Sequence, residues 1–308
     1  MRIASLLASA TEILYGLGLG EHVVAISHEC DYPLEALTKP RITRSNIDAA
    51  ASSTAIDEQV RTDMSAGLPL YELDLDQLAE LSPDLIVTQA QCDVCAIRYE
   101  DVVAAVKKNP SLNRAQIVAL NPRRLTDIFD DIRRVGQASG AQTEADQWIK
   151  SLTDRVESIG HVTKTISPSQ RPRTLCVEWA EPLMAAANWT PELIDLAGGQ
   201  CELTRAGEHS TITKWEVVTA FDPEVIVVMP CGFDRGRSIS EGALLTKQAA
   251  WNNLSAVRNS RVFAVDGNAY FNRSGPRIVD SLEILAGLIQ ADHFNEMANR
   301  YRATWQRI

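Results

Sequence analysis

The stretch LSPDLIVTQ at residues 81–89 recurs in altered form as FDPEVIVVM at residues 221–229. Each copy ends a helical stretch at a polar residue and a proline, and then continues into an apolar run. The residue before a proline disfavours helical geometry, and a short unbroken apolar run is typical of a strand buried on both faces. The full match joins residues 73–89 to residues 213–229 at an offset of 140. The sequence therefore predicts the same helix–turn–strand unit twice.

A second short strand follows each copy, at residues 116–120 and 261–265, and a helical stretch precedes each of these strands, at residues 97–107 and 241–250. Strands that alternate with helices form parallel sheets covered on both faces, because the crossovers are right-handed. We predict an α/β protein with two Rossmann-like lobes whose sheets are mainly parallel.

The segment between the two lobes is expected to be helical. Residues 124–163 contain no proline, and apolar side chains recur at helical spacing from Leu125 to Ile159. Gly136 and Gly140 each cost roughly 1 kcal/mol in a helix without requiring a break. We predict one long inter-lobe helix, with a kinked helix as the alternative. The chain then has three parts: an N-terminal lobe at 1–123, a connecting helix at 124–165, and a C-terminal lobe at 166–308 that closes with helices at 275–290 and 291–305.

Composition excludes several classes of protein. The chain has 308 residues, 45% hydrophobic and 23% charged, which is ordinary for a globular protein. Its net charge of −10 repels a phosphate backbone, so we expect no nucleic-acid partner. No apolar run approaches the ~20 residues that cross a bilayer. We predict a soluble protein that is not embedded in a membrane.

The first ten residues imitate a secretory signal, with one basic residue, a short apolar stretch and an Ala-x-Ala end. The apolar pattern continues through Thr11 and Glu12 as an amphipathic helix, so we interpret residues 3–7 as a first strand. A chain of this length needs no disulfides to stabilise its core, although it has six cysteines. We predict a cytoplasmic protein with reduced thiols; the alternative is a periplasmic protein, if Met1–Ala10 belongs to a signal.

Ligands of open α/β sheets bind beyond the carboxyl ends of the strands, and two facing lobes form one cleft from two such edges. In the first lobe, Ser9 and Thr11 follow the first strand, and we expect one of them to cap the next helix. The loop after the strand at residues 23–26 contains His28, Glu29 and Cys30, which are candidates for ligand or metal contacts.

The loop after the strand at residues 85–88 contains Gln89, Gln91, Cys92 and Cys95. A thiol at the start of a helix has a lowered pKa, and the Cys-x-x-Cys spacing suits a dithiol, half of a zinc site or a soft ligand pair for another metal. Two buried, inert thiols are an equal alternative. If the two loops meet, one metal set would be His28, Cys30, Cys92 and Cys95.

In the second lobe, aromatic residues gather in the loops after the strands, although only 6% of the chain is aromatic. This placement favours a flat, partly apolar ligand. The candidate ligand contacts there are Trp179, Trp189, His209, Cys231, Phe233 and Tyr270, and His209 together with Ser210 is an alternative cap for the next helix. The chain has no nucleophile elbow, phosphate loop or His-Glu-x-x-His motif, so we predict no enzyme activity.

Several of these stretches together resemble one family. They are SLLASATE at 5–12, the turn from Ala25 to Pro33, the strand entry SPDLIV at 82–87, LAGG at 196–199 and RSGPR at 273–277. The chain is similar over nearly its whole length to the substrate-binding proteins of cobalamin and iron-siderophore ABC importers. The resemblance implies two Rossmann-like lobes joined by a rigid helix, and it adds Arg273 to the candidate ligand contacts.

The stretches HECDYP at 28–33 and QCDVCA at 91–96 resemble a cobalamin-binding subgroup of that family. The resemblance also implies docking on a permease through one acidic residue per lobe, and Asp76 and Glu216 stand at matching positions of the repeat. Where the resembled proteins place stacking tryptophans, this chain has Gln89 and Ser210, so the aromatic residues of the second lobe would have to replace them.

We therefore predict a non-enzymatic protein that holds a cobalamin-like corrinoid in the inter-lobe cleft. The alternative is a metal-thiolate protein that binds zinc, iron, haem or a siderophore through the His28, Cys30, Cys92 and Cys95 loops. A dithiol oxidoreductase that uses Cys92 and Cys95 ranks below both.

Overall fold

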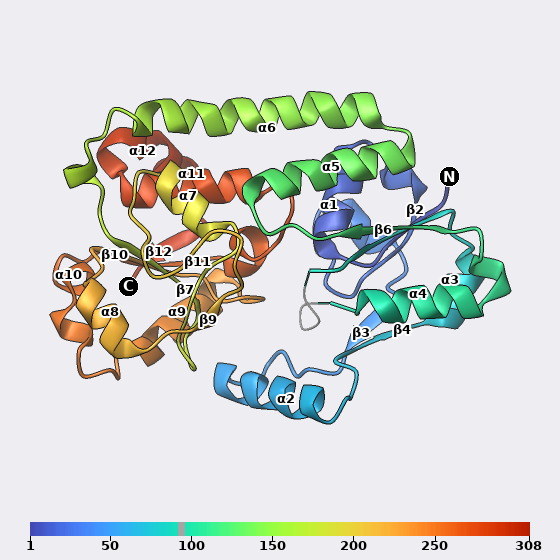
Figure 1. Ribbon diagram of the computed structural model, residues 1–308, viewed down its shortest axis with the longest axis horizontal. Helices are drawn as coiled ribbons and strands as arrows, with labels where there is room; N and C mark the ends of the chain where they lie inside the picture. The colour runs from blue at the N-terminus through green and yellow to red at the C-terminus, as the bar shows by residue number, and fades with distance from the viewer. Residues whose placement is uncertain (92–95) are drawn as a thin grey trace. The chain divides into compact units, whose positions relative to one another are not determined.

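The computed structural model describes residues 1–91 and 96–308 (Figure 1). The chain divides into two compact units. Unit 1 contains Met1–Pro122 and Thr126–Lys150, and unit 2 contains Arg123–Leu125 and Ser151–Ile308. Each unit has its own sheet, and each sheet explains where the loops of its own unit gather.

Unit 1 is built on four parallel strands in the order β2-β1-β5-β6. Residues of α3 and α4 form a core with one face of the sheet, and Figure 1 shows α1 and α5 (Leu125–Ser139) on its opposite side. A parallel sheet covered on both faces explains the continuous apolar runs in the sequence. The elements are β1 (Ile3–Ser5), α1 (Ala8–Gly16), β2 (Val23–Ile26), α3 (Leu75–Leu81), β5 (Leu85–Gln89), α4 (Tyr99–Lys108) and β6 (Gln116–Leu120).

A small excursion leaves this sheet between β2 and α3. The strands β3 (Thr43–Ser45) and β4 (Tyr71–Leu73) pair in antiparallel fashion, and α2 (Ser53–Ser65) lies between them in the sequence. Ser52 begins α2 by accepting a hydrogen bond from the amide of Ala55 at 3.2 Å, as an N-cap serine does. Short single-turn helices complete the unit at Gly20–His22, Leu34–Thr38 and Pro110–Leu112.

Unit 2 has six strands in the order β12-β11-β10-β7-β8-β9. β7, β10 and β11 are parallel, whereas β8, β9 and β12 add antiparallel edges. The strands are β7 (Thr174–Trp179), β8 (Met184–Ala185), β9 (Thr211–Ile212), β10 (Val225–Val228), β11 (Val262–Val265) and β12 (Trp305–Arg307). The helices are α7 (Thr190–Leu196), α8 (Trp215–Phe221), α9 (Arg235–Leu245), α10 (Ser255–Arg258), α11 (Ile278–Ile289) and α12 (Ala291–Arg300), with single turns at Pro168–Gln170 and Trp251–Asn253 and a π-helical turn at Gly267–Phe271.

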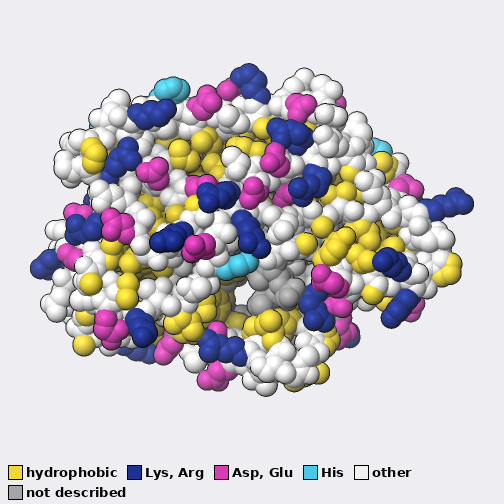
Figure 2. Space-filling model, viewed as in Figure 1, with side chains coloured by type: hydrophobic (Ala, Val, Ile, Leu, Met, Phe, Trp, Pro, Cys, Tyr) yellow, Lys and Arg dark blue, Asp and Glu magenta, His cyan; other side chains and the backbone are white. Residues whose placement is uncertain are grey.

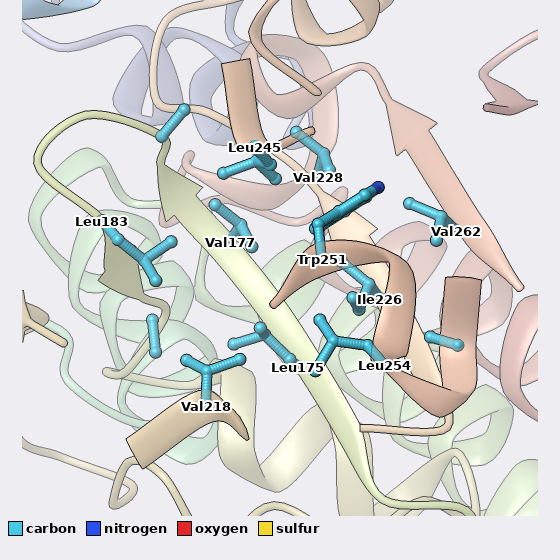
Figure 3. Close-up of a cluster of buried hydrophobic side chains, with 13 residues drawn as sticks. Leu175, Val177, Leu183, Val218, Ile226, Val228, Leu245, Trp251, Leu254 and Val262 are labelled. Carbon is cyan, nitrogen blue, oxygen red and sulfur yellow. The ribbon is translucent and has the colours of Figure 1, made fainter. Parts of the chain in front are cut away.

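One face of this second sheet packs against α8, α9 and α10. Val177, Ile226 and Val228 of the strands contact Val218 of α8 and Leu245 of α9, and Trp251 and Leu254 complete the cluster (Figure 3). Burying a side chain of this kind contributes about 1.5–3 kcal/mol. Figure 1 shows α7 and α11 on the other side of the sheet. The predicted α/β class with two lobes is therefore confirmed. The sheet of unit 1 is parallel throughout, whereas in unit 2 only β7, β10 and β11 are parallel to one another.

The internal repeat is confirmed at the level of single residues. α3 and α8 have the same length at an offset of 140, and each ends at a left-handed residue, Ser82 with φ 42° and Asp222 with φ 44°. β5 and β10 start at the same offset, three residues beyond these C-caps. The left-handed residue ends the helix, and the following proline prevents its continuation.

An arginine closes this turn in each unit. The Nε of Arg2 donates to the carbonyl of Leu81 at 2.7 Å, and the backbone amide of Arg2 donates to the Asp84 carboxylate at 2.7 Å. Arg173 makes the equivalent contacts, with Nε at 2.8 Å from the carbonyl of Phe221 and the amide at 3.0 Å from the Glu224 carboxylate. Each arginine thus satisfies a carbonyl that the end of the helix leaves without an intrahelical partner.

The prediction of one long helix at 124–165 is wrong, because the chain forms α5 (Leu125–Ser139) and then α6 (Gln142–Thr163). The break lies at Gly140, whose φ of +77° is a left-handed conformation that favours glycine. A Cβ on Gly136 would lie 2.6 Å from the Cβ of Ala145, so glycine permits the close approach of the two helices there. The two glycines therefore form a turn rather than weaken a continuous helix.

Other boundaries also differ from the predictions. α9 begins at Arg235 rather than at Glu241, because Asp234 caps it by accepting a hydrogen bond from the amide of Arg237 at 2.8 Å. Trp305 was predicted in the last helix but starts β12, which pairs with β11. The N-cap residues of α1 and α8 are Leu7 and Lys214, so neither Ser9, Thr11 nor the His209–Ser210 pair caps a helix.

No helix among residues 1–91 and 96–308 is long and apolar enough to span a bilayer. Figure 2 shows acidic and basic side chains interspersed over the face that it displays. On that face, neither sign of charge is gathered in one region.

Replacing Arg173 by Met tests the closing role of this arginine. We expect the free energy of unfolding to fall by about 1–3 kcal/mol, because the carbonyl of Phe221 and the carboxylates of Asp222 and Glu224 lose a charged donor. The measurement is urea denaturation followed by circular dichroism. Arg205→Met, at an exposed loop position, is the control and should change stability by less than about 0.5 kcal/mol. Equal effects of the two substitutions would contradict the assigned role.

Candidate functional site

The carboxyl ends of β1 and β2 bring the first two candidate loops of unit 1 together. Thr11, on α1, is fully buried, and its hydroxyl lies 2.7 Å from the hydroxyl of Ser5 and 3.0 Å from the Cys30 thiol. Ser9 is 1% exposed in the same helix. Cys30 is 0% exposed, so its thiol lies inside unit 1. The structure therefore gives Thr11 and Cys30 a packing role that the sequence did not predict.

His28 and Glu29 lie on the surface side of the same loop. His28 is half-buried, and its ring stacks on Tyr71 of β4 with centroids 5.5 Å apart. Its Nδ1 lies 2.7 Å from the Thr43 hydroxyl, and its Nε2 lies 3.9 Å from the exposed Glu29 carboxylate. Burial lowers the pKa of His28, and the nearby positive charge of Arg41 lowers it further. The imidazole is therefore neutral at neutral pH.

Arg41 holds the backbone of this loop in place. Its guanidinium donates to the carbonyl of His28, and also to the carbonyl of Cys30 at 3.0 Å. The backbone amide of His28 donates to the Thr43 hydroxyl at 2.9 Å. With contacts from the segment before β3, from β3 itself and from α1, the loop is fixed before any ligand arrives.

Tyr71 also lines a surface hollow of unit 1. The described residues around this hollow come from the end of α2, from β4 and from the segment before α4, and they include Met64, Leu68, Tyr71, Ile97, Arg98 and Asp101. Met64 and Leu68 are 47% and 55% exposed, so the hollow presents apolar surface to solvent.

The third candidate loop of unit 1 begins at the end of β5. Gln89 is 4% exposed, and its side-chain oxygen accepts a hydrogen bond from the amide of Gln91 at 2.6 Å. Cys92 and Cys95 lie outside the described residues. Among the described residues, no three His, Cys, Asp or Glu side chains converge as a metal site would require. The metal set that includes Cys92 and Cys95 stays a prediction.

In unit 2, Glu178 and Trp179 end β7 at the corresponding edge. The Glu178 carboxylate accepts a hydrogen bond from the Ser210 hydroxyl at 2.6 Å, and that hydroxyl accepts from the amide of Ala187 at 2.9 Å. Burial raises the pKa of the Glu178 carboxyl, and the hydrogen bond from Ser210 opposes this shift. Ser210 is thus engaged in a network at the end of the sheet.

Trp179 and Phe233 form the aromatic pair of this edge, with ring centroids 5.2 Å apart. The guanidinium of Arg237 lies 3.7 Å from the centroid of the Phe233 ring, within the range of a cation–π contact. The Nε1 of Trp179 is buried and has no hydrogen-bond partner within the described part of the chain. A buried N–H without an acceptor is costly, so this position suits a ligand that supplies one.

The other candidates of unit 2 have different surroundings. Trp189 is 6% exposed, and its Nε1 donates to the carbonyl of Phe271 at 3.0 Å, so it is a core residue. His209 and Cys231 are exposed. The amide of Cys231 donates to the carbonyl of Glu178 at 3.2 Å, which places that loop beside the end of β7.

Tyr270 and Arg273 belong to the segment that follows β11. Tyr270 is half-buried, with the Arg277 guanidinium 5.5 Å from its ring centroid. Arg273 is 9% exposed and donates to the side-chain oxygen of Asn268 at 3.1 Å. Burial raises the pKa of Asp266, which caps this segment by accepting from the amide of Ala269. Arginine side chains of two neighbouring strand-end loops thus contact aromatic rings at this edge.

Several residues of these two edges were not predicted as site residues, namely Arg41, Thr43, Tyr71, Glu178 and Arg237. Arg41, Thr43 and Tyr71 lie in or beside the antiparallel pair of β3 and β4, which the sequence did not predict. Glu178 precedes Trp179, so its position at a strand end was a usable signal. For Arg237, the first turn of α9 would have been the signal, but the start of that helix was misplaced.

The two predicted docking residues occupy equivalent positions. Asp76 and Glu216 are each the second residue of their helix, α3 or α8, and both are exposed. Acidic side chains in the first turn also stabilise a helix through its dipole, so the position alone does not distinguish the two roles.

Comparison with known proteins supplies the context for these edges. A family model described as periplasmic binding protein matches residues 3–269. The chain is 23% identical over 295 residues to an uncharacterized ABC transporter substrate-binding lipoprotein of Bacillus subtilis, covering 96% of this chain and 82% of that protein. It is 24% identical over 293 residues to a vitamin B12-binding protein of Vibrio cholerae, covering 92% and 86%.

Solved structures share the fold. The periplasmic vitamin B12 binding protein BtuF of Vibrio cholerae superposes with a TM-score of 0.66 and 22% identity over 94% of this chain and 96% of that chain. The periplasmic heme-binding protein RhuT from Roseiflexus sp. RS-1 superposes with a TM-score of 0.68 and 21% identity over 94% and 98%.

The prediction of a cytoplasmic protein is wrong. The matching family and the similar proteins are periplasmic or lipoprotein substrate-binding proteins, which points to a location outside the cytoplasm. That prediction depended on a first strand at residues 3–7 and on reduced thiols. The strand is confirmed, because β1 lies inside the sheet between β2 and β5, but a folded start of this kind does not determine the compartment.

Replacing Glu178 by Gln tests the burial of this carboxyl. Burial raises the pKa of the Glu178 carboxyl in the folded state. The neutral carboxyl therefore stabilises the wild-type fold below the ordinary pKa of 4.5, and this stabilisation is lost as the pH rises through the raised pKa. Gln stays neutral and still accepts from Ser210. We expect the free energy of unfolding of Glu178→Gln to exceed that of wild type increasingly from pH 4 to pH 8, by about 1.4 kcal/mol for each unit of the shift.

Urea denaturation at a series of pH values measures this difference. Glu208→Gln, at an exposed position of unit 2, is the control. A difference for Glu178→Gln that is constant across the pH range, or that shrinks as pH rises, would refute the assignment.

Proposed function

The chain belongs to the periplasmic binding protein family, and we propose that it binds a cobalamin-like corrinoid outside the cytoplasm and presents it to an ABC importer. The family is one of solute-binding proteins, and the similar proteins include a vitamin B12-binding protein and an ABC transporter substrate-binding lipoprotein. These similarities support the binding of a solute, and the identity of that solute as a corrinoid is our proposal.

The aromatic pair of Trp179 and Phe233 carries this proposal. A corrin ring is broad and partly apolar, and its rim carries amide side chains whose carbonyl oxygens accept hydrogen bonds. Trp179 is partly exposed and offers ring surface for the former, while Phe233, 5% exposed, packs against it. The Nε1 of Trp179, which has no acceptor among the described residues, would donate to the latter. These two residues take the place of the stacking tryptophans that the resembled proteins have elsewhere.

Haem is the second candidate ligand, and the arginines of unit 2 favour it. Arg237 and Arg277 contact aromatic rings at this edge, and Arg273 lies in the same segment as Tyr270. Arginine is the preferred partner of carboxylates such as the propionates of haem. The vitamin B12-binding protein of Vibrio cholerae, 24% identical over 92% of this chain, supports the corrinoid as the first candidate.

A matched pair of tryptophan substitutions tests the corrinoid proposal. Trp179→Phe keeps a ring but removes the N–H, and we expect corrinoid affinity to fall about 5–20-fold, the equivalent of about 1–2 kcal/mol. Trp189→Phe removes an N–H that already has an acceptor in the core, so stability should fall by about 1–2 kcal/mol while affinity stays unchanged.

Calorimetric titration with cobalamin, cobinamide and haemin measures these affinities. If haemin alone binds, the ligand is haem rather than a corrinoid. If none of the three binds, the proposal is overturned. Equal affinity of wild type and Trp179→Phe would remove Trp179 from the binding contacts.

Asp76 and Glu216 are proposed to pair with basic residues of the permease. Both are exposed at equivalent positions of the repeated helices. We expect the double substitution Asp76→Asn and Glu216→Asn to leave corrinoid affinity unchanged and to lower uptake of labelled corrinoid by cells about tenfold or more, because each charge pair at such an interface contributes about 1.5 kcal/mol or more. Asp48→Asn and Glu202→Asn, at other exposed acids, form the control. Unchanged uptake in the double variant would exclude this docking mode.

A further inference from the structure

His28 lies at the carboxyl end of β2 with its ring nitrogens in different environments. Resting on the proposed function, we propose that Nε2 of His28 is an axial ligand of the metal at the centre of the bound macrocycle. Imidazole nitrogen binds cobalt and iron well, and the metal of a corrinoid or a haem has positions above and below the ring.

The hydrogen bonds of Thr43 determine which nitrogen of His28 has the proton. The single hydroxyl proton of Thr43 is donated to Ser27 Oγ at 3.1 Å. The same hydroxyl oxygen accepts from the backbone amide of His28 at 2.9 Å, and its second lone pair faces His28 Nδ1 at 2.7 Å. With the Thr43 proton directed to Ser27, Nδ1 is the donor in this arrangement. Ser27 Oγ, which also accepts from the amide of Glu29, lies 3.5 Å from Nδ1. The neutral ring is then protonated at Nδ1, and Nε2 carries the lone pair.

This tautomer is the one that binds a metal through Nε2. A ligating histidine ordinarily donates its other N–H to an oxygen atom of the protein, which fixes the ring orientation. Here Thr43 accepts that N–H, and the ring of Tyr71 packs against the imidazole at 5.5 Å between centroids. The site thus has the surroundings of a metal ligand before the metal arrives.

The side chain of His28 is also partly open to solvent. The side chain of His28 is 22% exposed, and Nε2 makes no hydrogen bond to the described residues, since the Glu29 carboxylate lies 3.9 Å away. Coordination forms one bond from Nε2 to the metal and releases one bound water, with no change in oxidation state.

Cobinamide is the sharpest probe, because it lacks the nucleotide base that occupies one axial position in cobalamin. The protein is mixed with cob(II)inamide, and the electron paramagnetic resonance spectrum is recorded. An axial nitrogen splits the cobalt hyperfine lines into triplets, whereas an axial water does not. We expect triplets with wild-type protein.

Two variants assign the nitrogen. His28→Asn keeps an N–H donor near the position of Nδ1 but has no atom at Nε2, so the triplets should vanish and affinity for cobinamide should fall by roughly tenfold or more. His28→Gly removes the ring, and added imidazole should restore the triplets. His22→Asn, at the opposite end of β2, is the matched control and should leave the spectrum unchanged.

The outcomes separate this inference from the function on which it rests. If cobinamide binds to wild type without triplets, or if triplets persist in His28→Asn, the axial role is wrong and the corrinoid function stands. If cobinamide does not bind to wild type at all, both fall. Loss of the triplets in His28→Asn, together with their recovery in His28→Gly by imidazole, supports the assignment.

Discussion

The turn that leads from a helix into a central strand is the constraint on which each unit depends. In both units a left-handed residue ends the helix, a proline follows, and an arginine from the neighbouring strand, Arg2 or Arg173, closes the turn. The same arginine carbonyl accepts from the first amides of the next strand segment, at 2.8 Å from Asp84 and 2.7 Å from Glu224. This fixes the register of two neighbouring strands at their amino ends, so the loops at their carboxyl ends are free to diverge.

The repeated turn was predictable because its determinants are local. A polar residue, a proline and an apolar run occur together in the sequence, and they predicted the ends of α3 and α8 and the starts of β5 and β10 at the observed offset. The prediction of a single connecting helix was wrong because the break depends on packing between helices rather than on local sequence. Gly136 and Gly140 have unremarkable helix costs, but the contact between Gly136 and Ala145 depends on two helices that pack against each other, and periodicity contains no information on that packing.

The candidate site shows the same division. Strand ends were predictable, so His28 and Trp179 were expected beside them. In the structure, Nε2 of His28 and Nε1 of Trp179 make no hydrogen bond to the described residues. Burial was not predictable, since Cys30 and Trp189 looked similar to these residues in the sequence but belong to the interior. Thr43 and Arg41, which orient His28, lie 13 to 15 residues further along the chain. They belong to β3 or to the segment before it, and no sequence pattern predicted this strand or its pairing with β4.

Burial drives the titratable groups of both edges toward neutrality. It lowers the pKa of His28 in unit 1 and raises the pKa of Glu178 in unit 2, so each group favours its uncharged form. A neutral imidazole can bind a metal through the nitrogen that has no proton, and a protonated carboxyl can both donate and accept a hydrogen bond. Arg273 and Arg277 stand near Asp266, whose negative charge offsets part of theirs. At the edge of unit 2, burial and the pairing of opposite charges therefore both limit the net charge that the loops present.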